Sequence, residues 1–361
     1  MTASWIAAGL YDPHATNAAE RLELLHWIHE QGVSLEEMVE ACRRDQLGAV
    51  VGDRLLRPGR RLTMTDVAAE TGLSLAQVET VRRVGGFPDA EPTDPVYVED
   101  DLEMFRAFKV AAELFSPEEL AHFTRVIGSS LRRIAEAAGE MFLRDVEAPM
   151  QPHATELDKA KATAAGNELA RSATAVFDPM FRAHLEVATR TMRRAREGLS
   201  DYTMIPLTVA FVDLNGFTTR SGEVTPEELL SLIMSFESTA IDLVSEHGGR
   251  LIKLIGDEVM FTTIAPADAC HIAAEIVQHA SGWATSARGG IAHGFVLTSG
   301  GDVYGEVVNL ASRIADIAVS GELLVNESVV QSAPDLAFEP AGRRQLKGFS
   351  QPTRLWSLPV A

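Results

Sequence analysis

The sequence is poor in cysteine and in positive charge, and both deficits narrow the range of functions. Only two cysteines, Cys42 and Cys270, occur in 361 residues. They stand far apart without Cys or His neighbours at metal-ligand spacing, which excludes a disulfide framework and favours a reducing compartment. A net charge of −19 argues against extended binding to nucleic acid or an anionic membrane, where Lys and Arg displace counterions. Nucleotide substrates remain compatible with this charge, because a metal ion can neutralise their phosphates.

The sequence also lacks a long apolar run. No stretch approaches the roughly 18 consecutive apolar residues of a membrane span, and Met1 to Leu10 has no basic segment typical of a signal peptide. We therefore expect a cytoplasmic protein. What is present is the composition of a globular protein, with 46% apolar and 23% charged residues. At roughly 100 to 200 residues per domain, the chain is long enough for two domains.

The N-terminal half has helical periodicity from about Ala18 to Met150. Ser34, Ser74 and Ser116 each precede a periodic segment and are expected to cap its helix. We expect an all-helical domain over residues 1–177, followed by a connector helix over residues 178–203. Basic residues near the end of the connector suit the negative end of a helix dipole.

The C-terminal part, residues 204–361, has a different pattern in which short β-branched and aromatic runs alternate with helical segments. The order β-α-β-β-α-β predicts an α+β domain with a ferredoxin-like sheet and helices on one face. The expected elements are strands at Leu207 to Val212, Arg250 to Ile255, Val259 to Thr263 and Gly290 to Leu297, and helices at Pro226 to Glu246, Ala267 to Gln278 and Val303 to Ile317.

Two acidic residues stand where predicted strands end. Asp213 leads into a turn with Gly216, and Asp257 follows Gly256 between two strand-like runs that predict a tight hairpin. Each is a common turn residue when taken alone. If the hairpin lies beside the first strand, the two carboxylates come close enough to share a pair of Mg²⁺ ions.

A third segment carries Asn309 and Arg313 four positions apart on a predicted helix. Residues at this spacing share one face of a helix, so an amide and a guanidinium can converge on one ligand. Asp302 precedes this helix, and Lys253 lies on the strand before the hairpin.

Together these segments closely resemble the catalytic domain of the class III adenylate cyclases, over about Met204 to Leu358. The resemblance implies that Asp213 and Asp257 bind metal, with help from the Leu214 carbonyl. It implies that Lys253 and Asp302 recognise adenine. The further roles that it implies are ribose orientation by Asn309, transition-state stabilisation by Arg313, and substrate binding by Lys347 and Phe217.

The implied reaction converts ATP to 3′,5′-cyclic AMP and pyrophosphate with two Mg²⁺ or Mn²⁺ ions in each active site. In the family the two aspartates act with residues of a partner chain. Because this chain holds both sets, the resemblance implies a homodimer that is required for activity. The segment between Gly294 and Asp302 is shorter than the hairpin arm of many members.

Two alternatives are weighed against this interpretation. A diguanylate or guanylate cyclase is suggested by Gly300-Gly301-Asp302, but Val303 and Tyr304 stand where the diguanylate signature needs a second acid. A helix-turn-helix DNA-binding regulator is suggested by residues 62–83, with Gly72 at the turn. Six basic and ten acidic residues between Arg60 and Lys109 make DNA a poor partner for it.

The N-terminal half resembles, more loosely, the regulatory domain of the mycobacterial soluble adenylate cyclases that respond to pH. The resemblance implies control of the catalytic half, with a proton or a lipid as the regulatory input. A proton sensor near neutral pH is expected to be a histidine. His184 on the connector is the preferred candidate, and its competitors are His26, His29, His122 and His153.

Overall fold

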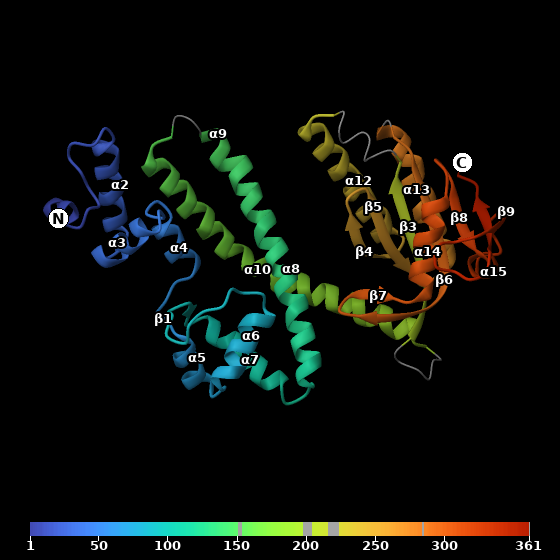
Figure 1. Cartoon of the computed structure of the whole chain (residues 1–361), viewed down its shortest axis with the longest axis horizontal. Helices are drawn as coiled ribbons and strands as arrows, with labels where there is room; N and C mark the ends of the chain where they lie inside the picture. Colours follow the sequence, from blue (N-terminus) through green and yellow to red (C-terminus); the bar gives the residue numbers. More distant parts are fainter. Residues whose placement is uncertain (151–153, 198–203, 216–223, 284, 361) are drawn as a thin grey trace. The chain divides into compact units, whose positions relative to one another are not determined.

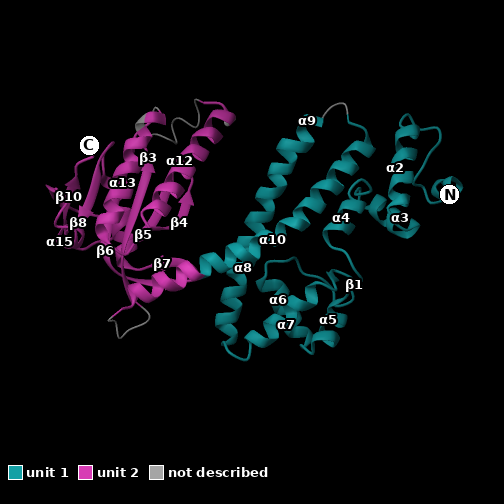
Figure 2. Cartoon of the chain, turned by 180° about the vertical axis from the view of Figure 1, so that it is seen from behind, with its two compact units in different colours: residues 1–185 teal, residues 186–361 magenta. Residues whose placement is uncertain are grey.

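The computed structural model describes residues 1–150, 154–197, 204–215, 224–283 and 285–360. The chain divides into two compact units, Met1–Leu185 and Glu186–Ala361 (Figure 2). Each unit contains its own clusters of buried apolar side chains. No helix in the described ranges is both long and apolar enough to cross a bilayer.

Unit 1 is built from helices whose starts follow the capping signals in the sequence (Figure 1). The Ser34 and Ser74 side chains accept hydrogen bonds from the N–H groups of Glu37 and Gln77, and both caps form complete capping boxes. The predicted caps are confirmed. The helices are α1 (Thr2–Ala7), α2 (Ala18–Glu30), α3 (Leu35–Arg43), α4 (Val50–Leu56), α5 (Met64–Thr71), α6 (Leu75–Val84), α7 (Asp101–Ala111), α8 (Pro117–Phe142), a π-helix (Leu143–Glu147), α9 (Ala148–Met150) and α10 (Glu156–Ala195).

Two features of unit 1 differ from the expectation. A short antiparallel pair, β1 (Arg61–Leu62) with β2 (Tyr97–Val98), interrupts the helical pattern. Two-residue strands leave no period in the sequence, and tertiary pairing rather than alternation defines them. In addition, α10 begins at Glu156 and continues past Pro179, so the helix that contains the connector is longer than predicted.

Unit 2 contains a sheet with the strand order β4-β5-β3-β6-β8-β10-β9, and β7 pairs with β6 outside this path. Neighbours are antiparallel except β6 and β8, which are parallel. The predicted β-α-β-β-α-β order is confirmed. The elements are β3 (Met204–Leu214), α12 (Pro226–Glu246), β4 (Arg250–Ile255), β5 (Glu258–Thr263), α13 (Pro266–Ala280), a 3₁₀ turn (Ser281–Trp283), β6 (Ala287–Ser299), β7 (Asp302–Tyr304), α14 (Glu306–Ile317), β8 (Leu323–Asn326), α15 (Glu327–Ser332), β9 (Glu339–Arg344) and β10 (Thr353–Leu358).

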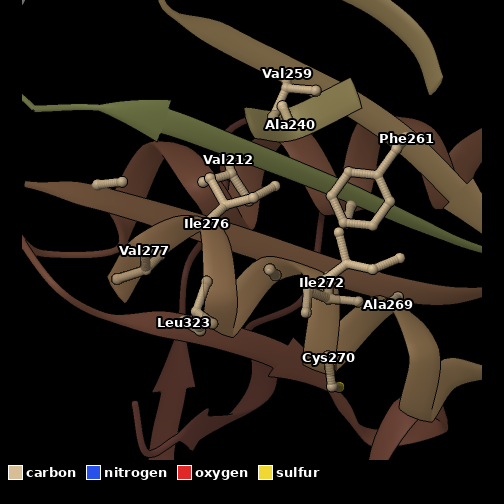
Figure 3. Close-up of a cluster of buried hydrophobic side chains, with 14 of the residues drawn as sticks. Val212, Ala240, Val259, Phe261, Ala269, Cys270, Ile272, Ile276, Val277 and Leu323 are labelled. Atoms are coloured by element: carbon tan, nitrogen blue, oxygen red, sulfur yellow. The ribbon is translucent and has the colours of Figure 1, made fainter. Parts of the chain in front are cut away.

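Alternate residues of β3 enter two different cores, because successive side chains of a strand point to opposite faces. Val212 and its even-numbered neighbours pack with α12 and α13 in the cluster of Figure 3. Phe211 and its odd-numbered neighbours pack with Ala311, Ile314 and Ala315 of α14. The expectation of helices on one face is therefore wrong for α14, which covers the opposite face.

Gly290 explains how α14 lies so close to the sheet. A Cβ atom at this position of β6 would stand 2.2 Å from the Ala315 nitrogen and 2.4 Å from the Ala311 oxygen. Real Cβ atoms do not approach backbone this closely, so only glycine fits here. The contact fixes the position of the helix that carries Asn309 and Arg313.

Candidate active site

The predicted metal-binding aspartates are brought together at the end of β3. Gly256, with φ +65°, and Asp257 form a two-residue turn between Ile255 and Glu258, so the predicted tight hairpin is confirmed. The Leu214 N–H donates to the Asp257 carbonyl oxygen at 3.0 Å, which ties the turn to the end of β3. The Leu214 side chain is buried in the core.

Arg288 is a site residue that the sequence reasoning missed. It pairs with Asp213 in the register of β3 and β6, and its Nη2 and Nε donate to Asp213 Oδ2 at 3.1 and 3.3 Å. Its Nη1 donates to the carbonyl oxygens of Asp316 and Ala318, both at 3.1 Å. The sequence expectation began this strand at Gly290, whereas β6 begins at Ala287. An earlier start would have placed Arg288 opposite the first strand.

Four carboxylates share this end of the sheet, and we call Asp213, Asp257, Glu258 and Asp316 the acidic cluster. Burial raises the pKa of Asp213; the hydrogen bond from Arg288 opposes this shift, and the charges of Asp257 and Asp316 add to it. Burial and the charges of the other three carboxylates raise the pKa of Glu258 to about 7. Burial is the largest cause of both pKa shifts, and the charges of the neighbouring carboxylates add to it.

A divalent cation fits the acidic cluster by its chemistry. Oxygen ligands are those that Mg²⁺ prefers, and it commonly takes one or two protein carboxylates with the rest of its ligands from water and substrate phosphates. Within the described ranges, no group of three or more His, Cys, Asp or Glu residues has the arrangement of a complete metal site.

Lys253 and Asp302 form an ion pair between β4 and β7, with Nζ 2.5 Å from Oδ2. Burial alone would raise the pKa of Asp302, but hydrogen bonds from Lys253 and the Val303 N–H lower it overall. The carboxylate is thus ionised and accepts hydrogen bonds at neutral pH. Asp302 begins β7, and α14 begins only at Glu306. The helix predicted from Val303 was too long because β7 pairs with β6.

Asn309 and Arg313 lie on one face of α14 and line a cavity of about 590 Å³. Arg313 Nη1 contacts Asp316 Oδ2 at 2.7 Å with both side chains largely exposed, so this pair is weak and leaves the guanidinium available to a ligand. Lys347 reaches the same cavity from the loop before β10. We call this space the α14 cavity; its lining is Gly305, Glu306, Asn309, Arg313, Lys347, Gly348, Phe349 and Ser350.

The remaining site prediction and one regulatory candidate lie outside the described residues: these are Phe217 and His153. His184 is exposed on α10. His26 and His29 both make T-shaped contacts with the buried Trp5 ring, with ring centroids 5.0 and 6.2 Å from that of Trp5.

The helix-turn-helix outline in unit 1 is present, since α5 ends at Gly72 with φ +70° and α6 starts after Ser74. Its second helix exposes Leu75. Arg82 of the same helix donates to the Pro88 carbonyl oxygen at 2.6 Å and lies over the rings of Phe87 and Tyr97. This arginine serves the packing of unit 1, which favours a structural role for the motif over DNA binding.

Comparison with known proteins agrees with this division of the chain. The model of the adenylate cyclase regulatory domain matches residues 3–192, and that of the adenylate and guanylate cyclase catalytic domain matches residues 201–358. The catalytic match defines a nucleotide cyclase, which is a phosphorus–oxygen lyase. The chain belongs to the class III cyclase family, in the group whose members carry an adenylate cyclase regulatory domain.

Its relatives include proteins of mycobacteria and streptomycetes. An uncharacterized protein of Mycobacterium tuberculosis is 32% identical over 98% of this chain and 92% of its own length. A pH-sensitive adenylate cyclase of the same species is 31% identical over 96% of this chain and 90% of its own length. An adenylate cyclase of Streptomyces coelicolor is 31% identical over 80% of this chain and 75% of its own length. Among solved structures, the adenylyl cyclase CyaB of Pseudomonas aeruginosa covers 44% of this chain and is itself covered to 95%, with 24% identity and a TM-score of 0.41.

Proposed function

We propose that this cyclase converts ATP to 3′,5′-cyclic AMP and pyrophosphate as a cytoplasmic homodimer, with two Mg²⁺ or Mn²⁺ ions in each active site. The observation that carries the choice of ATP is the Lys253–Asp302 ion pair. Adenine presents a donor amine next to a ring acceptor, which suits an ionised Asp302 and a Lys253 ammonium. Guanine presents an acceptor and a donor in the reverse order, and is disfavoured. The relatives named adenylate cyclases support the same choice.

Asp213 and Asp257 are the residues that would hold the cations. When bound, the ions would lower the pKa of the ribose 3′-hydroxyl and neutralise the triphosphate. Arg288 keeps the Asp213 carboxylate in one orientation through its two hydrogen bonds. The contact with Arg288 also leaves Asp213 with oxygen lone pairs for a second ligand.

The residues of the α14 cavity would bind the rest of the substrate. Asn309 orients the ribose, Lys347 attracts the triphosphate, and Arg313 meets the charge that develops on the α-phosphoryl oxygens. A contact of this last kind accelerates the reaction only as far as it strengthens in the transition state. The weak pairing of Arg313 with Asp316 makes such a rearrangement inexpensive in free energy.

The homodimer is supported by the resemblance to the class III cyclases, in which the two aspartates act with residues of a partner chain. The lining of the α14 cavity contains Asn309, Arg313 and Lys347, whereas Asp213 and Asp257 lie at the end of β3. A two-fold dimer places the aspartates of one chain opposite the α14 cavity of the other and creates two equivalent sites. A monomer would then be inactive.

Unit 1 is proposed to control the catalytic unit, with a proton or a lipid as its input. The match to a regulatory domain and the pH-sensitive relative support this proposal. His184 remains the preferred proton sensor. The measurement is the pH–rate profile of the full chain carrying His184→Gln, compared with His26→Gln and His29→Gln. An unchanged profile in all three would remove histidine sensing at these positions.

The reaction is tested by assaying purified protein with ATP and with GTP, each with Mg²⁺ and with Mn²⁺. We expect cyclic AMP from ATP. Turnover of GTP alone, to cyclic GMP or a cyclic dinucleotide, would replace the proposal by a guanylate or diguanylate cyclase.

The shared site is tested by mixing inactive variants. A mixture of Asp213→Ala and Arg313→Ala chains should recover activity, up to about one quarter of the wild type, because half the dimers are mixed and each has one intact site. The matched control is a mixture of Asp213→Ala and Asp257→Ala, whose lesions fall in the same half-site. If both mixtures stay inactive, the shared site is wrong.

A further inference from the structure

Arg250 opens β4 and reaches the turn that precedes Asp302. Its Nη2 donates to the carbonyl oxygen of Gly301. Gly300 and Gly301 have φ values of +58° and +84° and connect Ser299 of β6 to Asp302 of β7. Two successive left-handed residues are what a two-residue hairpin turn requires. Arg250 therefore binds the segment that delivers the Asp302 carboxylate.

The strand that carries Asp302 is short, and its middle residue, Val303, packs into the core beside α14. β7 is three residues long and pairs with β6 alone among the strands that the structure describes. Two tethers connect it to β4, namely the Lys253–Asp302 ion pair and the hydrogen bond from Arg250 to Gly301. In the proposed function Lys253 also binds the base, so the substrate competes with the Lys253–Asp302 ion pair. The substrate does not compete with the hydrogen bond from Arg250 to Gly301.

The surroundings of Arg250 suit this use. The side chain is only partly exposed; burial lowers its pKa, and the charge of Asp302 raises it. The guanidinium stays charged at neutral pH, and its planar fork holds a carbonyl in a defined direction. It also adds positive potential beside Asp302, which favours the ionised carboxylate.

We propose that Arg250 is a positioning residue for base selection, which acts by holding the Gly300–Gly301 turn and thereby the Asp302 carboxylate. The proposal rests on the function proposed above. A fixed carboxylate opposes guanine, because it faces the O6 acceptor without a hydrogen between them. A carboxylate on a loosened turn can move away from that clash, so guanine is tolerated better and adenine is bound less well.

The test compares Arg250→Met and Arg250→Lys with the wild-type full chain, using ATP and GTP as separate substrates. In Arg250→Met we expect the ratio of kcat/KM for ATP to that for GTP to fall about tenfold, mainly through a higher KM for ATP. Arg250→Lys, which retains a donor and a charge, should recover part of the ratio. The matched control is Arg343→Met on the exposed part of β9, which should leave the ratio unchanged.

A second measurement separates positioning from a general structural effect. If Arg250 acts through Asp302, then Arg250→Met added to Asp302→Ala should cause no further loss in the ATP to GTP ratio. A full additional loss of the ATP to GTP ratio in the double variant overturns the proposal. An unchanged ratio in Arg250→Met, or a lowered ratio in Arg343→Met, also overturns it. Failure of the wild type to use ATP would instead overturn the proposed function.

Discussion

The acidic cluster and the α14 cavity lie in the same unit and differ in charge. Around the first, the Arg288 guanidinium donates to Asp213 and the Arg313 guanidinium contacts Asp316, while burial with mutual repulsion raises the pKa values of Asp213 and Glu258. Around the second, Arg313 and Lys347 face a space of about 590 Å³ with a single carboxylate, Glu306, in its lining. In the proposed function the first region would hold the cations and the second would hold the phosphates, so the two regions would bind different parts of one metal–nucleotide complex.

The largest expected effect comes from removing a charge of the acidic cluster. Asp213→Asn should lower kcat by about a thousandfold or more, because a neutral amide binds divalent cations poorly. Mg²⁺ should raise the melting temperature of the wild type but not that of this variant, since an ion stabilises only the state that binds it. The measurements are cyclic AMP formation and thermal unfolding with and without Mg²⁺.

The control for this change is Glu246→Gln at the exposed end of α12. It removes one negative charge from the same unit and leaves all four carboxylates of the acidic cluster in place. Equal losses of activity or of the Mg²⁺ effect in both variants would mean that net charge, and not the acidic cluster, is responsible.

The second largest expected effect comes from removing a charge of the α14 cavity. Arg313→Ala should lower kcat by about a hundredfold to a thousandfold, because a preorganised donor to the transition state is lost. Unlike Asp213→Asn, it should retain the Mg²⁺-dependent rise in melting temperature. Loss of that rise would show that the two regions are not functionally separate.

A smaller effect, on the free energy of unfolding, tests the close packing of α14 on β6. Gly290→Ala forces a methyl group into the backbone of α14 and should lower the free energy of unfolding by about 3 kcal/mol. Gly282→Ala is the control, because a Cβ there meets nothing within 4 Å. Urea unfolding of both variants is the measurement, and equal stabilities would contradict the close packing of α14 on β6.

The order of strands and helices in unit 2 could be predicted because each element has its own period and its own boundary signals. The turn at Gly256–Asp257 followed from a short segment in the same way, whereas the association of Lys253 with Asp302 came from the resemblance to the adenylate cyclases. The roles of Arg288 and Gly290 could not be predicted in this way, because they depend on which strand and which helix pack against β6. Sequence spacing describes neighbours along the chain, whereas these residues act on neighbours across the sheet.

The smallest predicted effect concerns His293, which lies on β6 away from both charged regions. Its Nδ1 is 3.0 Å from Thr208 Oγ1, and burial lowers its pKa, opposed by a hydrogen bond to the Leu207 backbone. The unfolded chain then binds more protons than the native one below the ordinary histidine pKa of about 6.5. Stability conferred by the neutral ring is present above this pH and is lost as the pH falls toward the native pKa.

His293→Gln should therefore weaken the decline in stability that sets in below about pH 6.5, relative to the wild type. His279→Gln on the exposed surface of α13 is the control and should retain the wild-type decline. Urea unfolding followed across this range measures both. A steeper decline in His293→Gln would mean that the native state favours the protonated ring. In that case the contribution of His293 to the pH response would have the opposite sign, and the surroundings of His293 would stabilise a charge rather than exclude one.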